Sequence, residues 1–506
     1  MSSSRCFKVG RPTLAVLGFR AAGSLLAALA CACACACSIS CKGGSSKGGA
    51  DAGPIVCQDL SERLQPAVTG DLWVRADGDD ASDGRTRATA LATIQRGVDL
   101  LQPGETLVIG PGEYFGPVRA AGLGSQEAET VIRAEIPGTV LLRGDRPAPA
   151  FRPLEGYRRV YVADFDSDEE VQVMNEVDTL RVLPRVPNIA ELEFSPGRFF
   201  QDLAAGRLYV SSSDAGPADR HAYTLTVIGT HGLYLDAPVR VRVEGLAVTG
   251  FNSYIGQAYG EQTLWATYGI FFRNGKRSVI RGCMAYLNGR GMGTSNEYDE
   301  TAGDNSIESC QAWGNGGVGL GYDTGGIDLL YARRDQVRDS VAFLNQANGI
   351  SMRGGVTDHT EADASFVRGS LSWGNLEYDF WIKAGENFNY YESSVALGRT
   401  GNTDHLRRCV TGAGAAQGDD SIVLDLEEGL DLDREFADPL NQDFRLQAGS
   451  RFIGAATGGG DRGAFDHNED VRYLAPDGSD DADGLSIDQA FGTFARALQG
   501  LAPGHT

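Results

Sequence analysis

One pattern occurs four times between residues 268 and 398: a small polar pair, a short apolar strand, an asparagine and a second strand. The asparagines Asn288, Asn315, Asn345 and Asn375 are separated by 27, 30 and 30 residues. Repeats of this length indicate a solenoid, in which each coil buries its apolar side chains only against its neighbours. A solenoid grows along one axis, so a chain of 506 residues avoids the size limit of a single core.

Counting from each asparagine predicts which strand positions face inward. Positions five and seven residues on are mostly apolar, as at Ile350 and Met352, and we assign them to the interior. Positions six and eight residues on are expected to face solvent, about 4.8 Å apart from coil to coil. The resulting surface strip contains Arg273, Asn296, Asp323, Arg353 and Lys383, flanked by Phe271 and Trp381.

The asparagines are explained by turn chemistry, because Asn tolerates the left-handed conformation and stacked amides hydrogen-bond from coil to coil. We therefore interpret them as scaffold. The strip is the better candidate for function, since exposed faces of a rigid solenoid usually carry it. Cys283 and Cys310 hold equivalent places in successive coils, where we expect a buried free pair, with a disulfide as the alternative.

The composition narrows the class of protein. The chain has 67 acidic and 45 basic residues, and the net charge of −22 argues against nucleic acid as a partner and favours a soluble protein. The 67 glycines suit many short strands with tight turns. Motifs of serine hydrolases, phosphate-binding loops and dinucleotide-binding folds are absent from the sequence, and no CxxC pair supports a zinc site.

Residues 1–30 predict export to the cell envelope or beyond. A basic start is followed by the apolar run AAGSLLAALA, which is too short to span a bilayer permanently. The run ends at Cys31 and resembles the signal of bacterial lipoproteins, which implies lipidation of Cys31 and a membrane anchor, with Cys41 as another candidate. Residues 31–70, rich in Gly and Ser at their centre, are expected to be a flexible linker.

Residues 71–118 resemble the opening of secreted right-handed parallel β-helix proteins of the pectate-lyase superfamily, including the segments ATIQ and PGEY. The resemblance implies an all-β fold with a short N-terminal capping helix. Leu91, Ile94, Val98 and Leu101 lie at helical spacing, which supports that helix. The acidic loop before it offers Asp77, Asp79 and Asp83 as candidate Ca²⁺ ligands. The loop lacks the spacing of a defined calcium site, and turn chemistry is the favoured alternative.

We predict one β-helix domain over residues 71–470. Residues 119–240 are less regular, and GRFFQDLAAGRLYV predicts an inserted hairpin. Residues 436–465 resemble the closing segment of bacterial β-helix proteins. Residues 477–506 then repeat residues 77–106 without gaps, with 12 of 30 positions identical. We therefore expect residues 471–506 to be the truncated start of a second β-helix.

The order of segments in residues 291–383 is similar to that of the family-nine pectate lyases, in CQAWGN, SVAFLN and NGISMRGG. Those enzymes hold Ca²⁺ with Asp residues and abstract a proton with a Lys. Here the corresponding positions carry glycines and Ser351, so the resemblance implies shared architecture without the same chemistry.

The strip leaves two interpretations open. A lyase on an acidic polysaccharide needs a base and a cation that neutralises a uronate carboxylate. Lys383 could be that base, with Arg353 lowering its pKa and Asp323 as a further catalytic candidate. Substrate contacts would come from Arg273, Phe271, Asn296, Trp381, Asp379 and His359. Alternatively, Asp323, Arg353 and Lys383 form a surface ion ladder of small energetic value.

A glycosidase is a less favoured option, because it needs two carboxylates about 5–10 Å apart, and only Asp323, Asp328 and Asp379 are candidates. We predict an exported, monomeric β-helix protein that binds or processes polysaccharide. The alternative is a surface module that binds glycans without catalysis. No cofactor is assigned, and Ca²⁺ stays an open expectation.

Overall fold

The computed structural model describes residues 68–464 with internal gaps, together with residues 479 and 481–482. The gaps are residues 228, 253, 256–264, 297–298, 300, 317–324, 354–360, 383–388, 398–399, 402–405, 408, 412–417, 420–421, 424–433, 439–442, 448 and 457–458. Contacts divide the chain into Met1–Pro66 and Ala67–Thr506, and the described residues belong to the second unit. Within the described part, no helix is both long and apolar enough to cross a membrane.

Three parallel sheets account for most of the described strands. Sheet A contains β1 (Leu72–Val74), β2 (Thr106–Ile109), β5 (Thr130–Ala134), β16 (Val241–Glu244), β21 (Val279–Arg281), β24 (Ser306–Glu308), β27 (Gln336–Arg338), β30 (Phe366–Arg368), β33 (Tyr390–Glu392), β36 (Leu406–Arg407) and β38 (Gly418–Asp419). Sheet B contains β3 (Gly112–Phe115), β6 (Val140–Arg143), β17 (Leu246–Thr249), β22 (Met284–Tyr286), β25 (Gln311–Trp313), β28 (Val341–Phe343), β31 (Leu371–Trp373), β34 (Val395–Ala396), β37 (Val410–Thr411) and β39 (Ile422–Val423). Sheet C contains β4 (Val118–Ala121), β15 (Leu233–Asp236), β20 (Tyr268–Arg273), β23 (Arg290–Ser295), β26 (Gly325–Leu330), β29 (Asn348–Arg353), β32 (Phe380–Ile382) and β35 (Thr400–Gly401).

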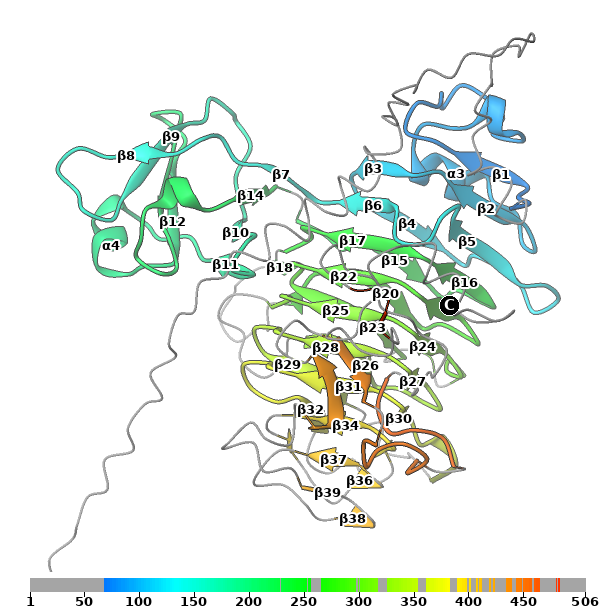
Figure 1. The fold of residues 1–506 in the computed structure, drawn as a ribbon. Coiled ribbons are helices and arrows are strands. Elements are labelled where there is room, and N and C mark those ends of the chain that lie inside the picture. The colour runs from blue at the N-terminus through cyan, green and yellow to red at the C-terminus, as the bar shows by residue number, and fades with distance from the viewer. Residues whose placement is uncertain are drawn as a thin grey trace, which may run out of the picture. The chain divides into compact units, whose positions relative to one another are not determined.

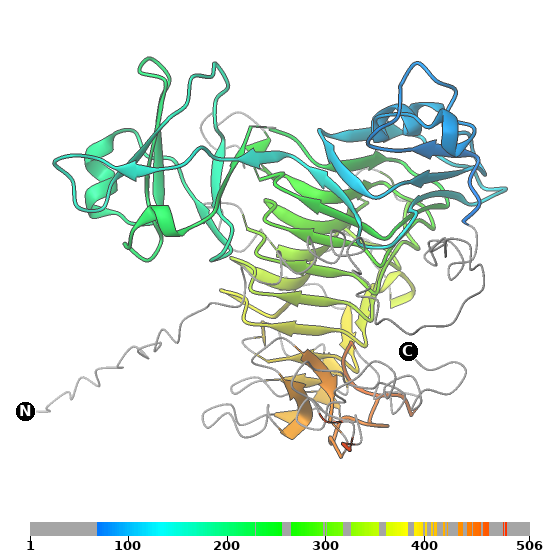
Figure 2. The ribbon, with the colours of Figure 1, turned by 45° about the horizontal axis from the view of Figure 1, so that its top comes forward.

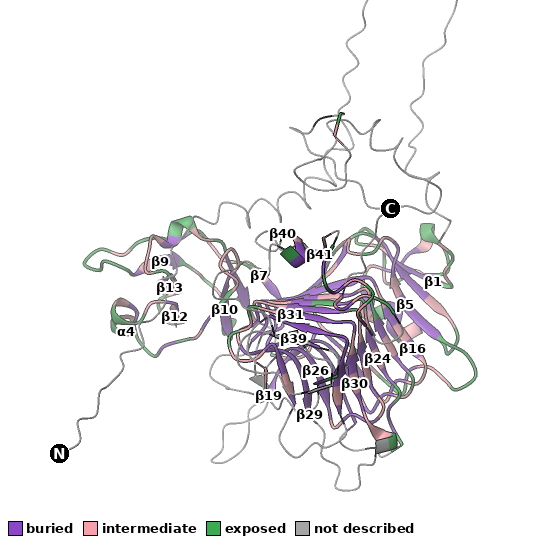
Figure 3. Cartoon of the chain, turned by 60° about the horizontal axis from the view of Figure 1, so that its bottom comes forward, coloured by how far each residue is buried: buried purple, intermediate pink, exposed green. Residues whose placement is uncertain are grey.

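The chain visits sheets A, B and C in turn, and each coil lies on the previous one, as Figures 1 and 2 show. Strands of successive coils pair in parallel, for example β23 with β26 and β26 with β29. The predicted fold class, a right-handed parallel β-helix, is therefore confirmed. The strands are largely buried and the exposed residues gather at turns and outer loops (Figure 3).

The interior combines stacked apolar side chains with polar ladders at the three turns of each coil. The Asn ladder lies between sheets B and C: the side-chain oxygens of Asn315, Asn345 and Asn375 each accept the backbone N–H of the preceding Asn, at 3.0–3.1 Å. A second ladder between sheets A and B contains Cys283, Cys310, Ser340, Ser370 and Ser394. A third, between sheets C and A, contains Ser278, Asn305, Asp335, Ser365 and Asn389. Cys283 and Cys310 are buried and free, as predicted.

The helix predicted around residues 91–101 is present as α3 (Ile94–Leu100), which follows the short 3-10 helix η1 (Arg87–Thr89). Its four spaced apolar residues are all buried, from 0% to 5% exposed. The side chain of Gln95 allows this helix to cover the end of the solenoid. Its side-chain amide donates to Arg119 O at 2.9 Å and accepts from Arg119 N at 2.7 Å, so it takes the place of a neighbouring strand at the edge of β4.

We expect Gln95→Ala to lower the free energy of unfolding by about 1 kcal/mol, because both backbone groups of Arg119 lose a protein partner at a water-accessible edge. The measurement is urea denaturation, followed by circular dichroism and fluorescence. Gln102→Ala is the matched control, since the side-chain amide of Gln102 reaches only Leu100 O. Equal midpoints for the two variants would contradict this role for Gln95.

An inserted module interrupts the helix between β6 and β15. One sheet contains β11 (Arg181–Leu183), β10 (Val173–Glu176), β14 (Tyr223–Thr226) and β7 (Asp145–Pro147). The other contains β12 (Arg198–Asp202), β13 (Arg207–Ser211), β9 (Tyr161–Asp164) and β8 (Arg152–Pro153). Two further helices, α4 (Ile189–Phe194) and η2 (Ala218–Arg220), complete the module. The predicted hairpin is confirmed, because β12 and β13 pair antiparallel.

The segment from Phe436 to Ala464 packs on the outer face of sheet B. Its strands β40 (Phe436–Asp438) and β41 (Asp443–Leu446) pair antiparallel. Phe436, Leu446 and Phe452 form one apolar cluster with Val341, Leu371 and Val395. This segment thus covers apolar side chains on one flank of the solenoid.

Candidate functional site

Two columns of side chains point outward from sheet C. Strand pairing aligns the first column across successive coils as Tyr234, Phe271, Gly293, Asp328, Ser351 and Trp381. The second column contains Asp236, Arg273, Ser295, Leu330 and Arg353. Half-exposed side chains stand at both ends of these columns, while the central ones are buried.

The predicted strip was wrong in register at Asn296. The prediction for Asp323 lies outside the described residues, and in that coil Asp328 and Leu330 hold the two outward places, in register with Ser351 and Arg353. Asn296 does not follow the outward column; it is buried and donates to Asp335 at 3.1 Å. The cause is variable turn length, since the outward residue follows its Asn by five, thirteen, six and six residues in the four coils.

The centre of the face holds a buried set of four polar side chains, which we call the Asp328 cluster: Tyr268, Arg290, Asp328 and Ser351. One oxygen of Asp328 accepts the Tyr268 hydroxyl at 3.1 Å and lies 3.4 Å from Arg290 Nη1, which also donates to Tyr268 Oη at 2.7 Å. Ser351 Oγ donates to the other oxygen. Each residue is at most 2% exposed, so the ion pair is fully enclosed.

Glycine makes room for this cluster. A Cβ atom on Gly293 would lie 2.9 Å from the Tyr268 ring and 3.3 Å from Asp328 Cβ. A second glycine column contains Gly269, Gly291, Gly326 and Gly349, and each lies against an amide of the Asn ladder, within 2.5–2.9 Å of where its Cβ would be. The ladder and the site are thus packed directly on each other.

The electrostatics of the cluster keep Tyr268 protonated. Burial raises the pKa of Tyr268; the charge of Asp328 adds to this, and Arg290 and Arg353 oppose it. His231 lies beside the cluster, with its ring 5.7 Å from that of Tyr268 and 5.2 Å from that of Phe271. Burial, together with Arg119 and Arg290, lowers the pKa of His231 to about 3, so this ring is neutral and its Nδ1 accepts the Tyr268 N–H at 2.9 Å.

The other predicted residues fall into three groups. Arg273, Arg353 and Trp381 are half-exposed on the outer face of sheet C, and Arg273 Nε lies 3.4 Å from Asp236. Phe271 is 8% exposed and packs on Tyr268, and Asp379 is buried, where it accepts the Asn375 amide at 2.6 Å and ends the Asn ladder. The predictions for Lys383, His359 and Cys31 lie outside the described residues.

Sequence reasoning missed Tyr268, Arg290 and His231. A signal for Tyr268 and Arg290 was present in a repeated pattern of three residues, in which any residue is followed by glycine and then by an apolar residue. The pattern occurs as YGI at 268–270, RGM at 290–292, GGI at 325–327 and NGI at 348–350. Aligning the coils on this glycine, rather than counting from the asparagine, places Tyr268 and Arg290 at the start of adjacent strands. No comparable pattern marks His231.

The acidic loop near the N-terminal end uses its carboxylates in turns. Asp79 accepts Ala81 N at 2.9 Å, Asp83 accepts the Thr89 hydroxyl at 2.7 Å, and Asp77 lies 3.2 Å from Arg75 Nε. The contacts of Asp79 and Asp83 are of the turn type that we favoured, and Ca²⁺ binding at this loop stays an expectation. Among the described residues, no group of three or more His, Cys, Asp or Glu side chains has the arrangement of a metal site.

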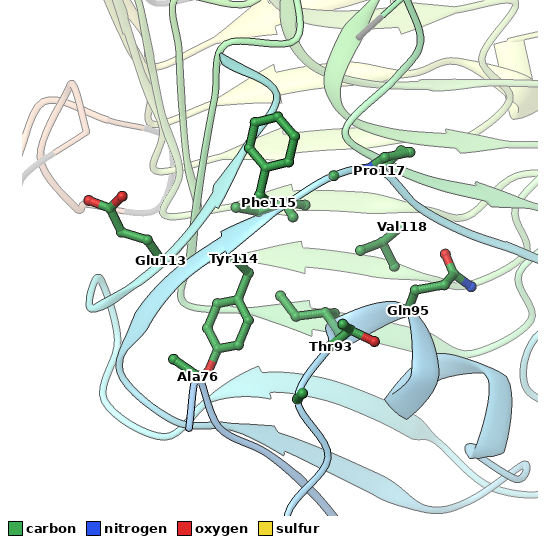
Figure 4. A pocket seen from close by; sticks show the side chains of 12 residues that line it. Ala76, Thr93, Gln95, Glu113, Tyr114, Phe115, Pro117 and Val118 are labelled. Atoms are coloured by element: carbon green, nitrogen blue, oxygen red, sulfur yellow. The ribbon is translucent and has the colours of Figure 1, made fainter. Parts of the chain in front are cut away.

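A cleft of about 290 Å³ lies between α3 and β3, lined by residues that include Thr93, Gln95, Glu113, Phe115 and Pro117 (Figure 4). None of the residues predicted for the site lines it. Glu113 is the one charged residue among those that line it, beside the polar residues Thr93 and Gln95. We therefore place the candidate site on sheet C, where charged, hydroxyl and aromatic side chains converge.

Comparisons with known proteins find similarity among solved structures alone. No family model and no curated protein matches the chain. Among solved structures, a complex of XylC with xylose is 11% identical (70% of this chain, 69% of that chain, TM-score 0.44). Pectate lyase Pel9A is 12% identical (79% and 98%, TM-score 0.43), and a glycoside hydrolase is 12% identical (70% and 96%, TM-score 0.42). At this identity the likeness concerns the fold alone.

Proposed function

We propose that this β-helix protein binds an acidic polysaccharide along the outer face of sheet C. The observation that carries the proposal is the arrangement of half-exposed Arg273, Arg353 and Trp381 around the enclosed Asp328 cluster. Arg273 and Arg353 hold the same register position three strands apart, which corresponds to about 14 Å along the solenoid axis. Two guanidinium groups at that spacing suit carboxylates on different sugars of one extended chain.

The aromatic side chains supply the apolar part of such a site. Trp381 is half-exposed one strand beyond Ser351, and Tyr234 is half-exposed at the other end of the same column. Aromatic rings of this kind present a flat apolar surface to the faces of sugar rings. The Asp328 cluster stands between them and keeps β20, β23, β26 and β29 in one fixed arrangement, which holds the surface ready for its ligand.

The test is affinity electrophoresis of the full chain in gels that contain polygalacturonate, alginate or neutral xylan. Arg353→Gln is expected to weaken binding to the acidic polymer about tenfold or more, because a hydrogen bond to a charged group contributes about 1.5–3 kcal/mol. Trp381→Ala should also weaken it. Arg281→Gln is the matched control, because this half-exposed arginine lies on sheet A and pairs with Glu308.

Binding that is equal for the wild type, Arg353→Gln and Trp381→Ala would overturn the assignment to sheet C. The proposal also fails if no acidic polymer retards the wild type. Added salt should weaken the interaction, since it screens charges near the surface.

Lyase activity is the second candidate, and half-exposed Arg353 favours it. A cation on the outer face of sheet C could neutralise the uronate carboxylate, as β-elimination requires. Lys383, one residue beyond β32, stays our predicted base for β-elimination. The test is the ultraviolet absorbance of unsaturated uronate ends, measured with and without Ca²⁺. A rise in absorbance that disappears in Lys383→Ala supports elimination. If the absorbance does not rise, binding without catalysis is the remaining function.

The cellular setting completes the proposal. The basic start and the apolar run before Cys31 support export and a lipid anchor at that cysteine. A monomer held at the envelope by a flexible linker would present sheet C to polymer outside the membrane. Incorporation of a radiolabelled fatty acid into the wild type, but not into Cys31→Ala, tests the anchor.

A further inference from the structure

A histidine in the inserted module stands among three carboxylates. His221 Nδ1 lies 2.8 Å from Asp178 Oδ2 and 4.0 Å from Glu176 Oε1, and Nε2 lies 3.4 Å from Asp214 Oδ1. The ring is 10% exposed, and its remaining neighbour of note is Tyr223, whose ring centroid is 6.2 Å away. The carboxylates come from the end of β10, the β10–β11 turn and the loop after β13, so one imidazolium ion can join three segments.

The same turn makes a contact between the module and the helix. Leu180, at the end of the β10–β11 turn, accepts a hydrogen bond from Gln346 Nε2 at 3.1 Å. Its side chain also lies 3.3–3.4 Å from the place where a Cβ of Gly314 would be. Gln346 follows the Asn ladder residue Asn345 and comes two residues before β29, which carries Ser351 and Arg353. The turn is thus one place where the module contacts the β-helix, close in sequence to the strand that carries Ser351 and Arg353.

Asp178 lies in this turn and contacts His221 directly. Besides binding the imidazole, it accepts Ala222 N at 3.0 Å, and Val177 N donates to Ala222 O at 2.8 Å. Without the proton on His221, Asp178, Asp214 and Glu176 would face one another around a neutral ring. Repulsion among them would then act directly on the turn that ends at Leu180.

We propose that protonation of His221 is a switch that fastens the inserted module to the β-helix at Leu180 and Gln346, and that its deprotonation releases this contact. The switch is independent of the polysaccharide proposal, because it concerns only the docking of the module. It would let the surroundings of sheet C respond to external pH.

The direction of the effect follows from the charges. Burial by itself lowers the pKa of His221, but the hydrogen bond to Asp178 and the charges of Glu176, Asp178 and Asp214 outweigh it, so the pKa is raised above 6.5. A raised pKa in the folded state means that the stabilising contribution is complete below the unfolded pKa of 6.5 and is lost as the pH rises through the folded pKa. The contact between the inserted module and the β-helix should thus be stable at acidic pH and weak at alkaline pH.

Hydrogen exchange of the full chain at about pH 5 and about pH 9, corrected for intrinsic rates, tests the switch. In the wild type we expect protection of the segments around Leu180 and Gln346 to fall about tenfold or more at the higher pH, because the imidazolium charge among the three carboxylates is lost. His221→Gln should show low protection at both pH values. Gln346→Ala serves as the control, because it removes the docking bond without touching the carboxylates.

Two results would overturn the switch: protection in the wild type that does not change with pH, or a change of the same size in His221→Gln. If His221→Gln does not fold, Asp178→Asn is a second variant for the same test. It keeps the side-chain shape but removes the main partner of the imidazolium, so it should abolish the pH dependence as well.

Discussion

Replacing Asp328 with alanine is expected to lower the free energy of unfolding by about 3–5 kcal/mol, because Arg290 would keep its charge in an enclosed site without its partner. The hydroxyls of Tyr268 and Ser351 would also lose their acceptor. Urea denaturation followed by circular dichroism and fluorescence measures the effect, and agreement of the two signals shows whether the transition is a single one.

Asp236→Ala is the matched control for this variant. Its carboxylate pairs with Arg273 on the same face, but the side chains are 33% and 40% exposed, so the loss should not exceed about 1 kcal/mol. Asp328→Asn should fall between the two, since an amide oxygen still accepts hydrogen bonds without the negative charge. If Asp328→Ala costs no more than Asp236→Ala, the cluster does not hold sheet C together.

Gly291→Ala is expected to lower the free energy of unfolding by about 3 kcal/mol. The added Cβ would lie 2.2 Å from Gly326 O in the next coil and 2.9 Å from the Asn315 amide, and neither the backbone nor the ladder can yield without shifting a whole coil. Because Arg290 is the preceding residue, the displacement should also disturb the Asp328 cluster. Thermal and urea unfolding of the purified variant measure the loss.

Gly460→Ala provides the comparison, since nothing lies within 4 Å of a Cβ at Gly460. This variant should unfold close to the wild type, within about 0.5 kcal/mol. A Gly291→Ala protein as stable as Gly460→Ala would show that the glycine column is not packed against the Asn ladder. The two variants change the same residue type in the same way, so only the surroundings differ.

The solenoid itself could be read from the sequence because its cause is local and periodic. The spacing of Asn288, Asn315, Asn345 and Asn375 reflects one turn repeated at the same place in each coil. Their ladder, the buried capping helix and the inserted hairpin were all predicted and are all present. Each depends on residues close in sequence or on a repeat, and both kinds of signal are visible in one chain.

The residues that make up the candidate site were harder to predict from the sequence. Arg273, Arg353 and Trp381 were placed on the outer face by counting, and strand pairing agrees with that placement. Asp328 was recognised only as a carboxylate of a less favoured mechanism, and Arg290 was not recognised. Counting failed between Asn315 and β26, where the outward residue comes thirteen positions after the Asn instead of six.

The sequence by itself determined the type of coil, the Asn ladder and the side of the solenoid that carries the aromatic and cationic residues. Only the tertiary structure decided the register of the outward column and the enclosure of Tyr268, Arg290, Asp328 and Ser351. The physical reason is that side chains alternate between the two faces of a strand, so turns of different length change which residues meet. Partners from four coils become neighbours only when the coils are stacked.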